Sequence, residues 1–245
     1  MRAISRCGLI VLSMVLIIGL IIPAGVWAAK EIKIGVIYPL TGGAAAAGRE
    51  LRAGVELAVE IANNAMADIN MTMAKAAGIT SMGGAKIELI FKDHEGNPTL
   101  GADLAKKLIL DDKVDGLLGC YHSSVTKTVS AVAEQYGVPM INGSSTSPAL
   151  TKRGFKWFWR TTPHDVWFTK DLFEMLNGLT EGKVKGVQAV PKKDIMNLSS
   201  ACEKTEWGSF VSELIQQFAK EYGYDIRKSM LYAKEAPDLS SEVRS

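Results

Sequence analysis

Short apolar runs alternate with longer amphipathic stretches along most of the chain. Residues 32–38 alternate and then become apolar, as a buried strand does, and residues 48–67 place apolar side chains on one helical face. A second strand is predicted over residues 86–91 and a second helix over residues 98–111, where Pro98 suits the first helical position. Strands that alternate with helices of this length predict right-handed crossovers and a parallel sheet, and hence an α/β fold.

Two polar turns follow strands in the middle of the chain. An apolar run from Val114 ends in the turn 119–124, GCYHSS, and a helix is predicted over residues 125–136. A second apolar run, residues 138–141, ends in the turn 142–148, NGSSTSP. In an open parallel sheet both turns fall at the carboxyl edge, where such sheets bind small ligands. The sequence therefore predicts a small-molecule site at this edge.

The same alternation continues to the end of the chain. The predicted elements are a strand over residues 155–160, a helix over 166–179, a strand over 196–202, a helix over 207–222 and a strand over 224–232. Residues 186–190 are the alternative for the strand before the last helix, but residues 196–202 are preferred because that helix follows them after a short turn.

The first 28 residues have the layout of a secretory signal peptide. Arg2 and Arg6 form a positive region, residues 9–22 are apolar except for Ser13 and Gly19, and cleavage is expected after Ala28. The alternative is a retained membrane anchor, although the apolar run is short for a membrane span. We expect export to the periplasm or the extracellular space.

The elements divide the chain into a signal peptide, residues 1–28, an N-terminal lobe, residues 29–163, and a partial second lobe, residues 164–245. Only two helix-bearing units fall in the second lobe, which would leave the edges of its sheet unpaired. We therefore expect this chain to be a fragment of a longer protein.

Composition and charge exclude one class of partner. The chain has 245 residues, 47% of them hydrophobic, with 28 Lys and Arg against 26 Asp and Glu. Removal of the signal peptide takes away Arg2 and Arg6 and leaves 28 − 2 = 26 basic residues, so the mature chain is near neutral. This balance argues against a nucleic acid held by phosphate neutralisation.

Cysteine and histidine give little sign of catalysis or metal binding. Cys7 lies in the signal peptide. Cys120 and Cys202 could pair in an oxidising compartment, but their sequence positions put them at the ends of different sheets, and we expect buried free thiols. The three histidines, at 94, 122 and 164, lack metal-ligand spacing, and we expect them on the surface or at the rim of a cleft.

The neighbouring His122 and Ser123 are residue types of a nucleophilic enzyme, but no Gly-x-Ser-x-Gly turn is present. The first turn of the sheet also lacks the Gly-x-Gly-x-x-Gly motif of dinucleotide sites. No catalytic residue, metal or cofactor is predicted.

Seven stretches together carry a resemblance to a known family. They are residues 34–42 (IGVIYPLTG), 93–98 (DHEGNP), 123–124 (SS), 137–141 (GVPMI), 144–148 (SSTSP), 158–161 (FWRT) and 205–208 (TEWG). In this order and spacing the chain resembles the leucine-binding family, the substrate-binding proteins of branched-chain amino-acid ABC transporters. The resemblance implies the type I periplasmic binding protein fold, with two Rossmann-like lobes built on parallel sheets, of which the second is incomplete here.

The family resemblance implies a two-lobed clamp that binds an amino acid in the cleft and delivers it to a membrane permease. It suggests that Ser123 meets the ligand carboxylate, that Ser144 offers its backbone carbonyl to the ammonium group and that Thr146 offers its hydroxyl. Ser124 and Ser145 complete the expected ligand-binding set. Tyr121, His122 and Trp207 are expected along the cleft, although Trp207 could instead pack at the start of its helix.

Physical reasoning supports the carboxylate site. Ser123 and Ser124 sit where the helix 125–136 begins, and free N–H groups with the positive end of a helix dipole stabilise an anion. The alternative is that one of these serines only caps the helix.

Two departures from the family leave specificity open. Some relatives place an aromatic residue in the first loop, where residues 44–47 are all alanine here, and some have a disulfide where Gly96 and His122 stand. A receptor sensor domain with the same fold is the alternative function. A membrane span or a kinase-like domain downstream of this sequence would favour the sensor.

Overall fold

Two parallel sheets organise the chain in the computed structural model, which describes residues 31–234, 236, 238–240 and 244. The first sheet has the strand order β2-β1-β3-β4-β5, and the second sheet consists of β6 and β7. All pairings between these strands are parallel, which confirms the predicted α/β fold with parallel sheets. The predicted signal peptide lies outside the described residues.

The elements follow the predicted alternation. The strands are β1 (Ile32–Tyr38), β2 (Ile87–Asp93), β3 (Gly116–Gly119), β4 (Met140–Asn142), β5 (Phe158–Arg160), β6 (Asn197–Glu203) and β7 (Asp225–Tyr232). The helices are α2 (Ala45–Asn63), α3 (Pro98–Leu110), α4 (Ser123–Tyr136), α5 (Asp165–Thr180), α6 (Lys192–Ile195) and α7 (Glu206–Tyr222). Short 3-10 turns are η1 (Thr72–Ala74), η2 (Thr80–Met82) and η3 (Pro148–Thr151). Across the part of the chain with described placement, no helix is both long and apolar enough to cross a bilayer.

Several predicted boundaries were wrong. The helix predicted over residues 48–67 begins at Ala45 and ends at Asn63, because Asn64 takes an extended conformation. The helix predicted from residue 125 begins at Ser123. The preference for residues 196–202 over 186–190 as the next strand is confirmed by β6.

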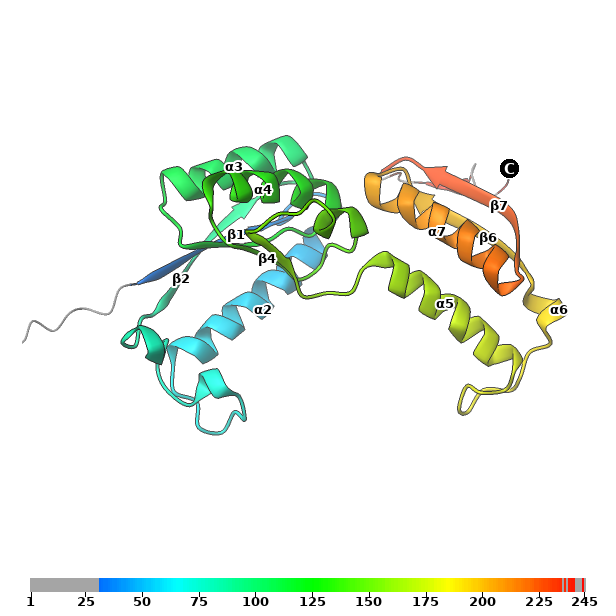
Figure 1. Ribbon diagram of the computed structural model, residues 1–245, viewed down its shortest axis with the longest axis horizontal. Coiled ribbons are helices and arrows are strands. Elements are labelled where there is room, and N and C mark those ends of the chain that lie inside the picture. The colour runs from blue at the N-terminus through cyan, green and yellow to red at the C-terminus, as the bar shows by residue number, and fades with distance from the viewer. Residues whose placement is uncertain (1–30, 235, 237, 241–243, 245) are drawn as a thin grey trace, which may run out of the picture.

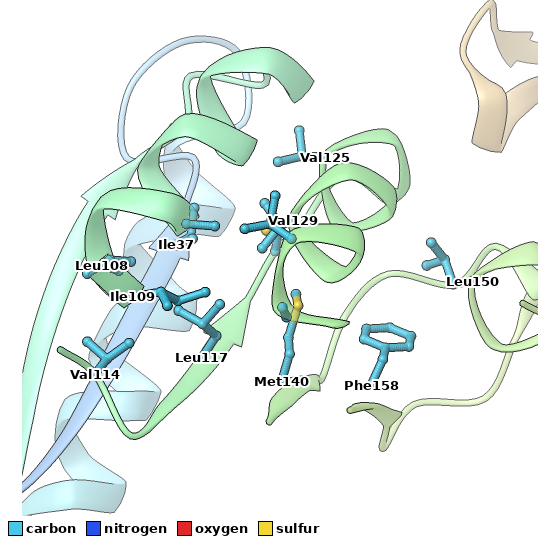
Figure 2. Packing of buried hydrophobic residues seen from close by; sticks show 14 residues of the cluster. Ile37, Leu108, Ile109, Val114, Leu117, Val125, Val129, Met140, Leu150 and Phe158 are labelled. Atoms are coloured by element: carbon cyan, nitrogen blue, oxygen red, sulfur yellow. The ribbon is translucent and has the colours of Figure 1, made fainter. Parts of the chain in front are cut away.

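Helices cover the first sheet on both faces, with α3 and α4 on one face and α2 on the other (Figure 1). Leu117, Met140 and Phe158 are laterally paired on β3, β4 and β5, and all three side chains are buried. Figure 2 shows them in one cluster with side chains of α3 and α4, including Leu108 and Val129. Burial of each large apolar side chain contributes roughly 1.5–3 kcal/mol, so this layer is the main stabilising core.

The opposite face of the first sheet is only partly covered. Val36, Leu118, Ile141 and Trp159 are successive lateral neighbours on β1, β3, β4 and β5. Val36 is fully buried, whereas Ile141 is 46% exposed and Trp159 is 50% exposed. Helix α2 contacts β1 and β2, so its cover ends before β4 and β5 within the described residues.

The second sheet has its own small core. Helix α7 lies along β6 and β7, and α5 packs beside α7 (Figure 1). Phe173 of α5 is buried against Phe218 of α7 and Tyr224, the residue just before β7. Helices α4 and α7 each end at a glycine in the left-handed region, Gly137 and Gly223, where a side chain would be strained.

The two polar turns meet at the carboxyl edge of the first sheet, and the buried side chain of Asn142 joins them. Its Nδ2 donates to the carbonyl oxygens of Gly119 (2.9 Å) and Cys120 (2.8 Å), and its Oδ1 accepts from the amide of Ser145 (2.9 Å). Ser145 in turn holds Thr126 of α4, with 2.6 Å between their hydroxyl oxygens. One amide side chain therefore fixes the turn after β3, the turn after β4 and the start of α4 relative to one another.

Glycine is required where α2 approaches the end of β1. A Cβ atom added at Gly48 would lie 1.8 Å from the carbonyl oxygen of Pro39, whereas one added at Gly54 in the same helix would meet nothing within 4 Å. We therefore expect Gly48→Ala to lower the free energy of unfolding by about 3 kcal/mol because backbone must shift. Gly54→Ala, the matched control, should raise it by about 0.5–1 kcal/mol through helix propensity. Urea unfolding of both variants tests this, and equal effects would contradict the packing at Gly48.

Replacement of Asn142 should destabilise the two polar turns at the carboxyl edge of the first sheet. In Asn142→Ala two buried carbonyl groups lose a donor and one buried amide loses its acceptor, and we expect a loss of about 2–4 kcal/mol in the free energy of unfolding. The exposed Asn70 of the loop before η1 offers a control, since Asn70→Ala should change stability by less than about 0.5 kcal/mol. An Asn142→Ala variant as stable as the control would show that the side chain does not hold the turns.

Candidate functional site

A cleft of about 820 Å³ opens at the carboxyl edge of the first sheet. Both polar turns line it, and so do the ends of β6 and β7 and the start of α7. The lining includes every residue singled out in the sequence: Tyr121, His122, Ser123, Ser124, Ser144, Ser145, Thr146 and Trp207. The structure thus brings these residues together, while their contact with a ligand stays a prediction.

A second hollow, of about 420 Å³, lies in the loop that carries η1 and η2. Its lining is Met71, Thr72, Met73, Ala76, Gly78, Ile79 and Thr80, none of which carries a charge. In Figure 1 this loop lies at the far end of α2, away from the second sheet. The larger cleft, with its convergent polar groups, is therefore the candidate site.

The start of α4 presents donors to the cleft. The residue before the helix is His122, and neither it nor the serines cap the helix through a side chain. The first backbone hydrogen bond of the helix joins the Thr126 amide to the His122 carbonyl at 2.9 Å, so the amides of Ser123, Ser124 and Val125 have no partner within the helix. The capping alternative is wrong, and the geometry suits an anion.

The hydroxyl residues of the turn after β4 differ in burial: Ser145 is buried, whereas Ser144 and Thr146 are half-buried. Ser145 is 1% exposed, and its Oγ donates to the carbonyl oxygens of Cys120 (3.1 Å) and Tyr121 (3.0 Å). Its hydroxyl is thus committed to holding the turns. Ser144 is half-buried, and its Oγ donates to the Cys120 carbonyl at 2.9 Å. Thr146 is also half-buried and lines the cleft.

Ser123 is mostly buried, with 5% of its surface exposed. Its Oγ accepts a long hydrogen bond, 3.4 Å, from the Ser147 amide, so the hydroxyl links α4 to the turn after β4. Ser123 therefore reaches the cleft chiefly through its backbone amide and the edge of its hydroxyl, whereas Ser124 is more accessible.

The facing wall comes from the second sheet. Trp207 is 41% exposed in the cleft, and its indole N–H donates to Oδ1 of Asp165 at 3.0 Å. Trp207 therefore both packs at the start of α7 and lines the cleft, so the two predicted roles coexist. Tyr232 and Lys234 also line the cleft, and neither was among the residues predicted from the sequence. Their position at and just after the carboxyl end of a predicted strand is the sequence signal that points to them.

The alanine loop after β1 forms another part of the wall, through Ala44, Ala46 and Ala47. Asp93 holds this loop, since Oδ1 accepts from the Leu40 amide at 2.9 Å and Oδ2 accepts from the Thr41 hydroxyl at 2.6 Å. Partial burial by itself raises the pKa of Asp93, but these hydrogen bonds outweigh it and hold the pKa below its usual value. The wall is apolar and lacks bulk.

The expectation that the histidines lie on the surface or cleft rim was wrong for His94, which is fully buried. Burial, followed by the nearby charge of His122, lowers the pKa of His94 to about 4, so it is neutral at pH 7. Its ring lies edge-to-face with that of His122, with 5.4 Å between centroids. His122 lines the cleft as expected.

No group of three or more His, Cys, Asp or Glu side chains able to hold a metal occurs among the residues with described placement. Cys120 and Cys202 are buried free thiols, the first just after β3 and the second in β6.

Curated relatives match most of the chain in sequence. The chain is 29% identical over 217 residues to "Leu/Ile/Val-binding protein homolog 7" of Brucella suis biovar 1, a match that covers 88% of this chain and 49% of that protein. The chain thus spans about half the length of this relative.

Solved structures show the same fold. A solute-binding protein of an ABC transporter from Rhodopseudomonas palustris BisB5, in complex with 3,4-dihydroxybenzoic acid, matches with a TM-score of 0.69 and 20% identity, over 87% of this chain and 50% of that chain. The branched-chain amino-acid transporter substrate-binding protein LivJ of Streptococcus pneumoniae, in complex with isoleucine, matches with a TM-score of 0.67 and 21% identity, over 88% of this chain and 53% of that chain. These likenesses confirm the type I periplasmic binding protein fold, of which this chain covers about half.

A family model described as "Periplasmic binding protein" matches residues 31–245. The match begins just after the predicted signal peptide and takes in both sheets and the cleft between them. The chain therefore belongs to the periplasmic binding protein family.

Proposed function

We propose that this protein is an extracytoplasmic solute-binding protein that holds an amino acid, of the branched-chain type or a similar small zwitterion, in the cleft for uptake by an ABC transporter. Residues 29–163 and 164–245 act as the two lobes of the clamp, and a membrane permease receives the ligand. Binding, rather than catalysis, is the activity. The signal peptide, residues 1–28, directs the chain out of the cytoplasm.

One observation carries the proposal: Ser123 and Ser124, whose amides have no partner within α4, line a cleft whose other wall comes from the second sheet. A carboxylate at this position gains hydrogen bonds from unpaired donors and the favourable end of the helix dipole. Tight side-chain capping would have removed this capacity, and His122 provides none.

The turn after β4 supplies the complementary groups. Ser144, with its backbone carbonyl, and Thr146, with its hydroxyl, line the same cleft as Ser123 and Ser124, and both oxygens are acceptors that suit an ammonium group. The relative from Brucella suis, whose name includes Leu/Ile/Val binding, supports this ligand class.

An aromatic carboxylic acid is the second candidate ligand. Ala44, Ala46 and Ala47 contribute only small side chains to a cleft of about 820 Å³ that Trp207 also lines, so the cleft has room for a flat aromatic ring. The Rhodopseudomonas palustris neighbour is in complex with such an acid. Both candidates share the carboxylate, and they differ in the need for an ammonium partner.

The carboxylate site predicts the effect of two substitutions. Ser123→Ala combined with Thr146→Ala should weaken binding of leucine by about 1–3 kcal/mol, because charge-assisted hydrogen bonds are lost. Isothermal titration calorimetry of the full-length mature protein, with leucine, isoleucine, valine and 4-hydroxybenzoate, measures the affinity and the ligand class together.

Thr128→Ala is the matched control for the loss of a hydroxyl group from α4, because the Thr128 hydroxyl donates to the Pro98 carbonyl away from the cleft. It should leave affinity unchanged. An unchanged affinity in the double variant would remove these two residues from the site, and stronger binding of 4-hydroxybenzoate than of any amino acid would favour the second candidate.

A further inference from the structure

Trp207 is held more firmly than an exposed aromatic residue needs to be. It occupies the first turn of α7, which Thr205 caps by accepting the Gly208 amide at 3.1 Å. A Cβ atom added at Gly208 would lie 2.1 Å from the carbonyl oxygen of Glu203, so this turn sits directly against the end of β6. The backbone beneath Trp207 is thus fixed, and only its side-chain torsions are left to be set.

Asp165 sets those torsions. It is the first residue of α5, 42 positions earlier in the chain, and only 5% of its surface is exposed. Its Oδ1 accepts the indole N–H of Trp207 at 3.0 Å. A buried carboxylate at a helix N-terminus is stabilised by the helix dipole, and a hydrogen bond to it is stronger than one between neutral groups.

Asp165 is tied to the first-sheet turn at the same time. Its backbone amide donates to the Thr146 carbonyl at 3.0 Å. The positive charge of Arg160 interacts with the Asp165 carboxylate, and the same guanidinium donates to the Ser147 carbonyl at 2.8 Å. One residue therefore contacts the turn that carries Ser144 and Thr146 and the tryptophan on the facing wall.

Within the described residues the second carboxylate oxygen, Oδ2, is buried and has no hydrogen-bond partner. Loss of the indole N–H would leave this buried carboxylate with no side-chain donor among the hydrogen bonds of the described residues. The hydrogen bond between Asp165 and Trp207 is thus costly to lose for the buried carboxylate.

We propose that Asp165 is a positioning residue that fixes the indole of Trp207 in the cleft and couples its orientation to the turn at Thr146. A ligand that touches the Thr146 turn and the indole then meets two surfaces held in one relative geometry. The coupling to ligand binding rests on the proposed function, whereas the fixed indole does not. A residue that served only as the acidic first residue of α5 would stabilise the helix without affecting Trp207.

The indole N–H signal of Trp207 in ¹H–¹⁵N NMR spectra of the chain from residue 29 onward tests the positioning directly. Trp207→Phe assigns the signal by its disappearance. Asp165→Ala should shift it upfield and speed its exchange with water at least several-fold, while Asp165→Asn, which keeps an acceptor oxygen, should have a smaller effect. The signals of Trp157, Trp159 and Trp167 serve as internal references.

Asp171→Asn is the matched control, since it removes an exposed carboxylate from the same helix. It should leave the Trp207 signal in place. An unmoved Trp207 signal in both Asp165 variants would overturn the proposal. If Asp165→Ala does not fold, Asp165→Asn alone tests the proposal. Neutralising the charged acceptor of the indole N–H should still shift the Trp207 signal.

Titration of the full-length mature protein with leucine tests the coupling. Asp165→Ala and Trp207→Phe should each weaken leucine binding by roughly tenfold. The double variant should bind leucine as tightly as the single variant with the lower affinity, because both substitutions remove the same interaction. A loss of affinity in the double variant equal to the product of the two single losses would overturn the coupling. If the parent chain binds no leucine, the proposed ligand fails while the indole signal still decides whether Asp165 positions Trp207.

Discussion

The site depends on one buried amide side chain, that of Asn142. The carbonyl groups of Gly119 and Cys120 are buried at the end of β3, where buried carbonyl groups need donors. The Asn142 amide donates to both, the hydroxyl groups of Ser144 and Ser145 add donors to the Cys120 carbonyl, and the Asn142 oxygen accepts from the Ser145 amide. The Asn142 side chain that forms these hydrogen bonds therefore also fixes the position of the turn after β4 relative to the turn after β3.

From this constraint the chemistry of the cleft follows. Because the turn after β3 is fixed, α4 starts at Ser123 with its first amides directed to the edge of the sheet. Because the turn after β4 is fixed, its carbonyl at Thr146 can hold the Asp165 amide, and Asp165 reaches the tryptophan of the facing wall. An electropositive helix end, a ring of carbonyl and hydroxyl groups and an aromatic side chain thus share one opening.

The sequence predicted what depends on periodicity. Alternating apolar runs and helical faces predicted the parallel sheets, and the position of each polar turn after a strand predicted that Ser123 and Thr146 would lie at one edge. The periodic signal is strong because it repeats over every strand and helix, and a shift of one or two residues does not remove it.

What it could not predict depends on single polar contacts. Ser145 and Ser144 are neighbours of the same type, yet only Ser145 is buried within the Asn142 network, and nothing in their sequence distinguishes them. His94 follows a strand, as residues of a binding loop do, but the fold buries it behind His122. Asp165 and Trp207 are far apart in the chain, so no local sequence pattern predicts their contact.

The backbone amide signals of the two turns test the central claim most directly. In a ¹H–¹⁵N NMR titration of the full-length mature protein with leucine, the amides of Ser123 and Ser124 and those of residues 144–146 should shift most, because the proposed site places the ligand carboxylate at the start of α4. Shifts confined to other regions, such as the hollow lined by Met71 and Thr80, with the α4 amides unmoved, would contradict the account.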